Sequence, residues 1–261
     1  MDADDTIDVD RLLGQCALVA VEYHPSLDST QDRATALAAA GERGPMLVLA
    51  DRQTAGRGRG ANRWWTGPGS LAFSLLVDPR DWGMAGEAVP ARSLAAGVAV
   101  VTAVRPALYP HNVGLHWPND VFVAGRKLSG ILIDVLADGR HVLGVGLNVN
   151  NRLDDAPADV RARATSMIDL TGRRHDRTSV LAAVLDELIH VLSQTGDDAV
   201  PLGAQFQELC LQTGELLEVV AGGRSVVGRC LGIAPDGALL LETDAGVRQL
   251  YSGVVRAAAG T

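Results

Sequence analysis

Cysteine is scarce in this chain of 261 residues, and the three that are present, Cys16, Cys210 and Cys230, lie far apart and form no CxxC pair. Scattered cysteines of odd number provide no disulfide framework and are typical of a reduced compartment. The six histidines include no HExxH motif, so the sequence predicts no dedicated metal cage. The acidic start has neither the basic residues nor the apolar run of a signal peptide. We therefore expect a cytoplasmic protein.

Long hydrophobic runs and an excess of positive charge are also missing. The longest apolar stretch, residues 94–104, lies between Arg92 and Arg105 and is shorter than the roughly 20 residues that cross a bilayer. The net charge of −8 disfavours non-specific binding to nucleic acid or to an anionic membrane, because each phosphate would meet an unfavourable overall field. The composition, 47% hydrophobic and 21% charged, is that of a globular protein with one or two domains.

Between residues 12 and 211 the hydrophobic pattern mixes helical and strand periods without a regular βαβ alternation, which indicates an α+β fold. Helices are predicted over residues 33–40, behind an N-cap at Asp28-Ser29-Thr30, and over residues 88–104 and 178–192. The apolar face of the last helix is formed by Leu181, Val184, Leu185, Leu188 and Leu192. Strands are predicted over residues 46–50, 71–77, 120–123, 126–136 and 141–147, and loops over residues 51–69 and 148–159. Ala124-Gly125 is the predicted turn of a hairpin, in which Phe122 pairs with Lys127.

The character of the chain changes near Thr213. Short strands are predicted over residues 215–220, 225–233, 238–242 and 247–251, with turn residues between them. Four or five strands in fewer than fifty residues indicate a small β-barrel of SH3-like size. We therefore expect two domains, residues 1–212 and residues 213–261.

The predicted loop over residues 51–69 contains the most informative segment. Residues 51–64 hold four arginines and one aspartate, a local charge of +3 in an acidic chain. Glycines let a backbone approach a ligand closely, and arginines donate forked hydrogen bonds to phosphate or carboxylate, so the segment predicts anion capture. A solvated surface loop is the alternative. Gly56-x-Gly58-x-x-Ala61 matches a dinucleotide fingerprint only formally, because five residues separate it from the strand and no helix can follow.

Two further segments carry polar groups on strands. Across the predicted hairpin, Asp120 and Lys127 share one face as diagonal neighbours about 7–8 Å apart. Such a pair suits a nucleotide phosphate with its magnesium ion, but an ordinary cross-strand charge pair is equally compatible. Asn148 and Asn150, at the end of a later strand, are a weaker signal, because asparagine also favours turns.

Together these segments resemble the biotin–protein ligase family, also called biotin–[acetyl-CoA-carboxylase] ligases. The resemblance covers about residues 24–150 and rests on four motifs in order: Ser29-Thr30-Gln31; Gln53 with Gly56-Arg57-Gly58-Arg59 and Trp64; Trp117-Pro118-Asn119-Asp120 with Arg126-Lys127-Leu128-Ser129-Gly130-Ile131; and Gly144-Val145-Gly146-Leu147-Asn148. It implies a mixed-sheet catalytic domain of the biotin/lipoate ligase type with helices packed on it, followed by the SH3-like barrel.

The resemblance also implies an activity. Such an enzyme uses ATP and Mg²⁺ to convert biotin to biotinyl-5'-AMP and passes the biotinyl group to a lysine of a biotin carboxyl carrier protein. Some members carry an N-terminal DNA-binding domain of about sixty residues. Here about 25 residues precede Ser29, and this stretch is acidic overall, so we expect the form without DNA binding and without membrane association. A homodimer is a family-based expectation.

The resemblance assigns roles to individual residues. The implied biotin-binding residues are Ser29, Thr30, Gln31, Gln53, Gly56, Arg57, Gly58, Arg59, Lys127 and Gly130. The implied ATP and adenylate residues are Arg57, Arg59, Arg63, Trp64, Asn119, Lys127 and Asn148. Lys127, Arg59 and Asp120 are the implied catalytic residues. Lys127 would bridge the biotin carboxylate and the α-phosphate, Arg59 would retain the intermediate, and Asp120 would bind Mg²⁺. Trp64 would stack on the adenine.

The chain departs from the family pattern at several positions. His116 stands where lysine is usual, Ala61-Asn62 where Gly-Arg is common, and Gln31 where asparagine is commoner. Two other functions stay open. A lipoate–protein ligase or octanoyltransferase resembles this family in fold but normally lacks the double-arginine loop. A non-enzymatic adaptor built on the C-terminal barrel is poorly supported, because Tyr251 is the only aromatic residue after Phe206.

Overall fold

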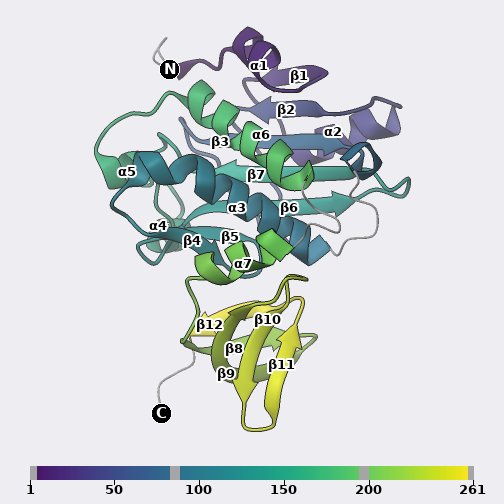
Figure 1. The fold of residues 1–261 in the computed structure, drawn as a ribbon. Helices are drawn as coiled ribbons and strands as arrows, with labels where there is room; N and C mark the ends of the chain where they lie inside the picture. The colour runs from purple at the N-terminus through teal and green to yellow at the C-terminus, as the bar shows by residue number, and fades with distance from the viewer. Residues whose placement is uncertain (1–4, 83–88, 194–199, 258–261) are drawn as a thin grey trace.

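The structure is a computed structural model that describes residues 5–82, 89–193 and 200–257 (Figure 1). Its larger sheet has seven strands in the order β1-β2-β3-β7-β6-β5-β4. The strands are β1 (Ala20–His24), β2 (Met46–Ala50), β3 (Leu71–Val77), β4 (Val113–His116), β5 (Asp120–Val123), β6 (Arg126–Val135) and β7 (His141–Leu147). β1 and β2 are parallel and the other neighbours are antiparallel, so the predicted mixed sheet is confirmed.

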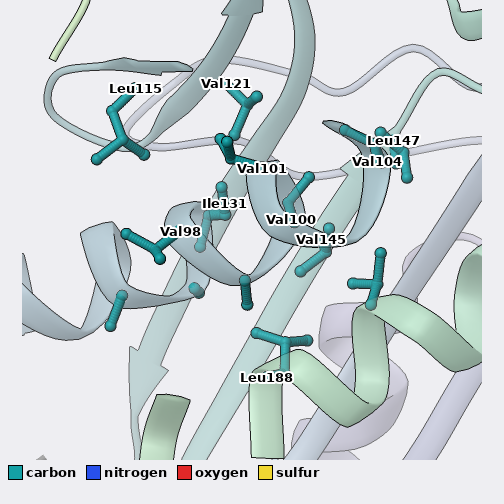
Figure 2. Close-up of a cluster of buried hydrophobic side chains, with 14 of the residues drawn as sticks. Val98, Val100, Val101, Val104, Leu115, Val121, Ile131, Val145, Leu147 and Leu188 are labelled. Carbon is teal, nitrogen blue, oxygen red and sulfur yellow. The ribbon is translucent and has the colours of Figure 1, made fainter. Parts of the chain in front are cut away.

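Helices cover both faces of this sheet. The helices are α1 (Val9–Gln15), α2 (Thr30–Ala39), α3 (Val89–Leu108), α4 (Ala158–Arg163), α5 (Met167–Thr171), α6 (Arg177–Ser193) and α7 (Val200–Leu209), with a 3-10 turn at Pro79–Trp82. α2 packs on β2, β3 and β7, whereas α3 and α6 pack together on the opposite face (Figure 1). Figure 2 shows this second layer, where valines of α3 meet Val121, Ile131 and Val145 of the sheet and Leu188 of α6.

β2 shows why the central strands have continuously hydrophobic sequences. All five of its residues are buried. Leu47 and Leu49 belong to the large core on the α3 side, whereas Met46 and Val48 pack with α2. Because side chains alternate along a strand, a strand covered on both faces must be apolar at every position.

The predicted helices and strands of this domain are confirmed, with shifts of a few residues at their ends. The helix predicted over residues 33–40 begins earlier, at Thr30, because the Ser29 hydroxyl accepts a hydrogen bond from the Asp32 amide and caps the first turn. Side-chain burial of the third predicted helix is described for Leu181, Val184, Leu185 and Leu188, which are all buried. Leu192, predicted on the same face, lies outside the residues whose side chains are described. The sequence did not predict α1, α4, α5, α7, β1 or β4.

α3 extends from Val89 to Leu108, beyond the predicted residues 88–104. By length and composition alone it is long and apolar enough to cross a membrane, but 67% of its most apolar window is buried inside the fold. Its valines contact the sheet and α6 (Figure 2). A buried core helix meets the same length and composition test, and this is the environment that α3 has.

The β5–β6 hairpin turns at Ala124 and Gly125, whose φ angles are 49° and 72°, as predicted. The pairing of Phe122 with Lys127 is also confirmed. A bulge between Val121 and Phe122, which the sequence did not predict, then shifts the register. Bulges bend a strand and redirect side chains, and they are frequent beside active sites.

The C-terminal part forms a separate five-stranded antiparallel sheet in the order β11-β10-β9-β8-β12, drawn in yellow-green tones in Figure 1. Its strands are β8 (Leu216–Ala221), β9 (Arg224–Ile233), β10 (Leu239–Thr243), β11 (Gly246–Leu250) and β12 (Val254–Ala257). The predicted all-β module is therefore present. Buried Trp117 of the larger domain joins the two sheets, because its indole nitrogen donates a hydrogen bond to the Gly237 carbonyl, 3.0 Å away.

Stability should fall in mild acid because of His141 at the start of β7. This side chain is 3% exposed, and its Nε2 lies 3.0 Å from the Arg92 guanidinium, which donates to a neutral imidazole. Burial, and then the charge of Arg92, lower the pKa of His141 from 6.5 to about 4. Below pH 6.5 the unfolded chain binds a proton that the native state rejects until about pH 4, so stability is lost over that range.

At 1.36 kcal/mol per pKa unit, His141 alone should remove roughly 2 kcal/mol of unfolding free energy between pH 7 and pH 5. His141→Gln keeps an acceptor for Arg92 but does not titrate. The unfolding free energy of this variant, measured by urea denaturation, should therefore fall by about that much less between pH 7 and pH 5. Exposed His111→Gln serves as the matched control. A pH dependence in His141→Gln identical to that of the parent chain would contradict the assignment.

Candidate active site

A cavity of about 840 Å³ opens on the α2 face of the larger sheet, between the segment of residues 53–66, the β4–β6 strands and residues 253–255 of the C-terminal sheet. Glycines form its floor. Gly130 of β6 and Gly146 of β7 are register partners, and Gly144 lies two residues along the same face. The cavity exists here because these positions carry no side chain.

The spacing above the glycine floor is tight. A Cβ atom on Gly146 would lie 2.1 Å from the Trp64 indole, and one on Gly144 would lie 2.5 Å from Gln31 Oε1. A Cβ on Gly130 would lie 3.0 Å from Lys127 Cε. Trp64, Gln31 and Lys127 therefore converge on one strip of exposed backbone. The indole nitrogen of Trp64 is buried and has no hydrogen-bond partner among the described residues.

The polar wall nearest α2 is a connected hydrogen-bond network. Gln53 Oε1 accepts from the Thr30 amide at 2.8 Å and from the Thr30 hydroxyl at 3.2 Å. The Ser74 hydroxyl lies 2.9 Å from the Thr30 hydroxyl and donates to Gln31 Oε1 at 3.0 Å. Gln31 Nε2 donates to the Val142 carbonyl at 2.9 Å. The amides and hydroxyls are thus held in fixed orientations beside the floor, and the sequence did not predict the part of Ser74.

The segment between β2 and β3, residues 51–70, is called the arginine loop. It folds back on itself as a short hairpin, in which Arg57 is bridged to Arg63 and the Gly58 amide donates to the Asn62 carbonyl at 2.9 Å. Arg57 forms ion pairs with Asp32 of α2 at 3.0 Å and Asp134 of β6 at 2.9 Å. The loop is therefore tied to both sides of the cavity.

Arg59 of the same loop reaches the other domain, where its guanidinium donates to the Gly253 carbonyl. Burial lowers the pKa of Arg59, and the nearby charge of Asp120 opposes this effect. A partly desolvated guanidinium interacts more strongly with an anion than one in water. The loop thus presents a cation at the junction between the two sheets.

Opposite the loop, β4, β5 and β6 place four side chains on one face. His116 pairs in register with Asp120, and Phe122 with Lys127. Lys127 Nζ lies 2.7 Å from Asp120 Oδ1 and 5.7 Å from the centre of the Trp64 ring. The predicted sharing of a face by Asp120 and Lys127 is therefore confirmed.

His116 stacks on Phe122 with ring centroids 4.2 Å apart. Burial lowers the pKa of His116, which Asp120 and Glu215 oppose. The imidazole is therefore mainly neutral at pH 7. The chain presents a flat, uncharged ring at a position where the family usually has a cation.

Asp120 fits a magnesium ion that accompanies a nucleotide. Its Oδ1 is buried and, among the described residues, has only the ion pair with Lys127 and no well-directed hydrogen bond. Magnesium binds oxygen ligands and is usually held by one or two carboxylates together with substrate phosphates. Within residues 5–82, 89–193 and 200–257, no group of three or more potential metal ligands lies together.

The two predicted asparagines help to build the cavity wall. Asn119 Nδ2 donates to the Ile131 carbonyl at 2.6 Å. Asn148 Nδ2 donates to the Thr165 carbonyl at 3.0 Å, and its Oδ1 accepts from Asn151. Through Asn148 the segment after α4 is fixed against β7.

All predicted site residues except Ser29 line this cavity. They are Thr30, Gln31, Gln53, Gly56, Arg57, Gly58, Arg59, Arg63, Trp64, Asn119, Asp120, Lys127, Gly130 and Asn148. Ser29 lies outside the described lining and its hydroxyl caps α2; its expected place beside biotin stays a prediction. Lining residues near α4 and at the start of β12 carry no signal in the sequence; they are Pro157, Asp159, Val160, Arg163, Ala164, Gly253, Val254 and Val255.

Two known families match this chain. The Biotin/lipoate A/B protein ligase family matches residues 23–150, which carry the glycine floor and the arginine loop. The Biotin protein ligase C terminal domain matches residues 209–255, which form the five-stranded sheet. The fold and the site thus define a protein ligase of the biotin/lipoate type with a biotin-ligase C-terminal module.

Comparison with individual proteins identifies the family more narrowly. The chain is 38% identical over 200 residues to the biotin–[acetyl-CoA-carboxylase] ligase of Mycobacterium tuberculosis, which covers 76% of this chain and 73% of that one. It is 31% identical over 242 residues to the bifunctional ligase/repressor BirA of Bacillus subtilis, which covers 88% and 71%. The solved biotin protein ligase from Aquifex aeolicus in complex with biotin and ATP is similar with a TM-score of 0.81 and 28% identity, over 92% of this chain and 100% of that one. This chain belongs to the biotin protein ligase family.

Proposed function

We propose that the chain activates biotin with ATP to biotinyl-5'-AMP and transfers the biotinyl group to a lysine of a biotin carboxyl carrier protein, such as that of acetyl-CoA carboxylase. The observation that carries the proposal is the convergence of Arg59, Lys127, Asp120 and Trp64 over a floor of glycines. The Aquifex aeolicus relative binds biotin and ATP, and the M. tuberculosis relative is named for the carboxylase, which supports both substrates. Residues 1–212 are the proposed catalytic domain and residues 213–261 the proposed second domain.

The cavity offers a place for each part of the two substrates. The ureido ring of biotin would lie at the network of Thr30, Gln31 and Gln53, whose amides and hydroxyls are fixed. The adenine would lie against Trp64, in the part of the cavity that Val160 of α4 and Ala164 also line. The carboxylate and the α-phosphate would then meet near Lys127, between these two regions.

In the first step a carboxylate oxygen of biotin attacks the α-phosphorus of ATP, the bond to the β-phosphate oxygen breaks, and pyrophosphate leaves. Negative charge grows on the phosphate oxygens, and cations fixed beside them lower the barrier. Lys127 and Arg59 are the cations in place, and Asp120 orients Lys127 at 2.7 Å. Magnesium, which Asp120 would help to hold, neutralises phosphate charge when bound.

In the second step a neutral lysine amine of the carrier attacks the acyl carbon, AMP leaves, and the amine gives up its proton. The anhydride must be kept from water until the carrier arrives. The arginine loop covers the floor and is linked to the C-terminal sheet through Arg59 and Gly253. The proposed activity takes place in the cytoplasm, where the reduced cysteines of the chain fit.

The proposal is tested by incubating the chain with ATP, Mg²⁺, biotin and a biotin carrier domain and measuring the mass of the carrier. One biotinyl group per carrier is the expected result, and omission of ATP should abolish it. Replacing biotin with lipoate or octanoate tests the related activities of the wider family. Modification with lipoate but not with biotin would overturn the proposal.

Arg59→Gly should release the adenylate from the cavity, because it removes the cation that ties the loop to Gly253. Released biotinyl-5'-AMP should biotinylate lysines of an added bystander protein such as serum albumin. The enzyme itself is a poor acceptor, since Lys127 is its only lysine. Arg52→Gly, in the same segment but outside the described lining, is the matched control. If labelling by Arg59→Gly stays confined to the carrier, Arg59 does not retain the intermediate.

A further inference from the structure

A buried arginine outside the cavity holds both ends of the arginine loop. Arg177, the first residue of α6, is 4% exposed. Its Nη1 donates to Asp51 Oδ1 and to the Ser70 carbonyl, each at 3.0 Å. Asp51 directly follows β2 and Ser70 directly precedes β3, so one nitrogen atom joins the two points where the segment of residues 51–70 leaves the sheet and returns to it.

The remaining donors of Arg177 are also engaged. Its Nε donates to Asp5 Oδ1 at 3.0 Å, and its Nη2 donates to the Asp5 carbonyl. Asp51 is held from the other side by the hydroxyl of Tyr23 in β1. Asp5, Tyr23, Asp51 and Arg177 form a cluster that we call the stem clamp.

Asn150 connects the stem clamp to the end of β7. Its backbone amide donates to the Gly69 carbonyl at 2.9 Å, and its side-chain amide donates to Asp5 at 3.2 Å and to the His175 carbonyl at 2.8 Å. Gly69 accommodates this contact because a Cβ there would lie 2.8 Å from Asn150 Cβ. The clamp thus fixes the loop stem to the same chain segment that carries Asn148 of the cavity.

The clamp contributes nothing to the lining of the cavity, since its four members lie outside the described lining residues. It nevertheless keeps ionised groups in the interior, where a charge is tolerated only if it is paired and hydrogen-bonded. Apolar contacts alone would dock α6, which already buries Leu181, Val184, Leu185 and Leu188. A fully bonded polar cluster adds what apolar packing lacks, a single defined geometry for the groups that it joins.

We propose that Arg177 is a positioning residue that sets the height and orientation of the arginine loop above the glycine floor. Gln53, whose Oε1 bonds to Thr30, is two residues from Asp51, so a displacement of the stem reaches the biotin side of the cavity directly. Arg59 and Trp64 follow on the same segment. Loss of the clamp should therefore weaken biotin binding and adenylate retention more than it slows the chemical step. These functional consequences rest on the proposed ligase activity.

Arg177→Lys keeps the charge but loses the forked donors that reach Asp51, Ser70 and Asp5 together. Tyr23→Phe is a milder variant, because it removes only one hydroxyl from Asp51 and keeps the ion pairs. The matched control is Arg140→Lys, since Arg140 also joins two elements through donors to the Ala38 and Glu42 carbonyls but lies away from the loop stem. Each variant and the parent chain are measured at temperatures that lie the same number of degrees below their own melting temperatures.

The first measurement is limited trypsin cleavage of the ligand-free protein, with sites identified by mass. The loop contains Arg52, Arg57, Arg59 and Arg63, after which trypsin cleaves. If the ends of the loop are no longer held by the clamp, cleavage within residues 52–63 should therefore become faster. Arg177→Lys should raise this rate at least about fivefold relative to Arg140→Lys, and Tyr23→Phe should raise it less. The second measurement is biotin-dependent ATP–pyrophosphate exchange. Here KM for biotin should rise about five- to twentyfold with a smaller change in kcat, within the roughly 10²-fold loss that a 1 Å misplacement produces.

The proposal would be overturned if both Arg177→Lys and Tyr23→Phe showed unchanged loop cleavage and unchanged KM for biotin, with only a lower melting temperature. Arg177 would then be a purely structural residue. If Arg177→Lys does not fold, Tyr23→Phe decides by the same two measurements. Failure of the ligase proposal would look different. The parent chain would then show no biotin-dependent exchange, whereas the trypsin result would still report on the clamp.

Discussion

Replacing Lys127 with alanine should reduce biotin-dependent ATP–pyrophosphate exchange by roughly 10²–10³-fold or more, the range found when one preorganised donor to a developing anion is removed. Lys127 is the ammonium group that lies between Asp120, at 2.7 Å, and the face of Trp64. The alanine variant lacks this cation where the carboxylate and α-phosphate would meet, and it leaves the Asp120 carboxylate without its ion pair. Near-normal exchange by Lys127→Ala would remove Lys127 from the mechanism.

Arg126→Ala is the control for this substitution. Arg126 is the neighbouring residue on β6, is exposed and carries the same charge, but it lies outside the described lining of the cavity. Exchange by Arg126→Ala should stay within a few-fold of the parent chain. Because Lys127 is the only lysine, acetylation of the intact protein provides a second measurement. Biotin and ATP together should protect Lys127 from the reagent, as read by peptide mass.

Gly146→Ala should raise KM for biotin by about five- to 150-fold, which corresponds to the roughly 1–3 kcal/mol that overpacking a tight site costs. A Cβ at this position would lie 2.1 Å from the Trp64 indole, so either the indole must shift or the ligand must lose its contact with the floor. The effect should fall on ligand binding rather than on the chemical step, because the cations of the site stay in place. KM for ATP should rise as well, because Trp64 is the proposed adenine contact. Isothermal titration with biotin measures this change without turnover.

Gly14→Ala in α1 is the matched glycine-to-alanine control, since a Cβ there meets nothing within 4 Å. It should leave biotin affinity unchanged and slightly favour the helix. The melting temperature of Gly146→Ala must also be recorded, because displacement of Trp64 lowers stability independently of binding. Unaltered biotin affinity in a folded Gly146→Ala would show that the glycine floor does not contact the ligand.

Local elements could be predicted from the sequence because their signals are short in range. Ser29 caps the helix that begins at Thr30, and its hydroxyl contacts an amide only three residues away. The turn at Ala124-Gly125 depends on the left-handed backbone of two adjacent residues. The continuous apolar run of β2 identifies a strand that is covered on both faces.

The bulge in the β5–β6 hairpin and the strands β1 and β4 were harder to predict. β1 has half-buried residues throughout, so it carries neither a clear alternation nor a continuous apolar run. The bulge changes the register by one residue without any distinctive residue at Val121 or Phe122. Such features arise from packing against neighbours rather than from local preference.

The chemistry of the site can be read from the order of residues alone: arginines on a glycine-rich backbone, one lysine paired with one aspartate, and strands that contain glycines. Which groups share the cavity, and which contacts hold them there, depends on the folded chain. Arg59 donates to the Gly253 carbonyl across nearly two hundred positions of sequence, and Arg177 reaches Asp51 across 126. Contacts of that length leave no periodic or neighbouring signal, because they exist only once the core has packed and brought distant surfaces together.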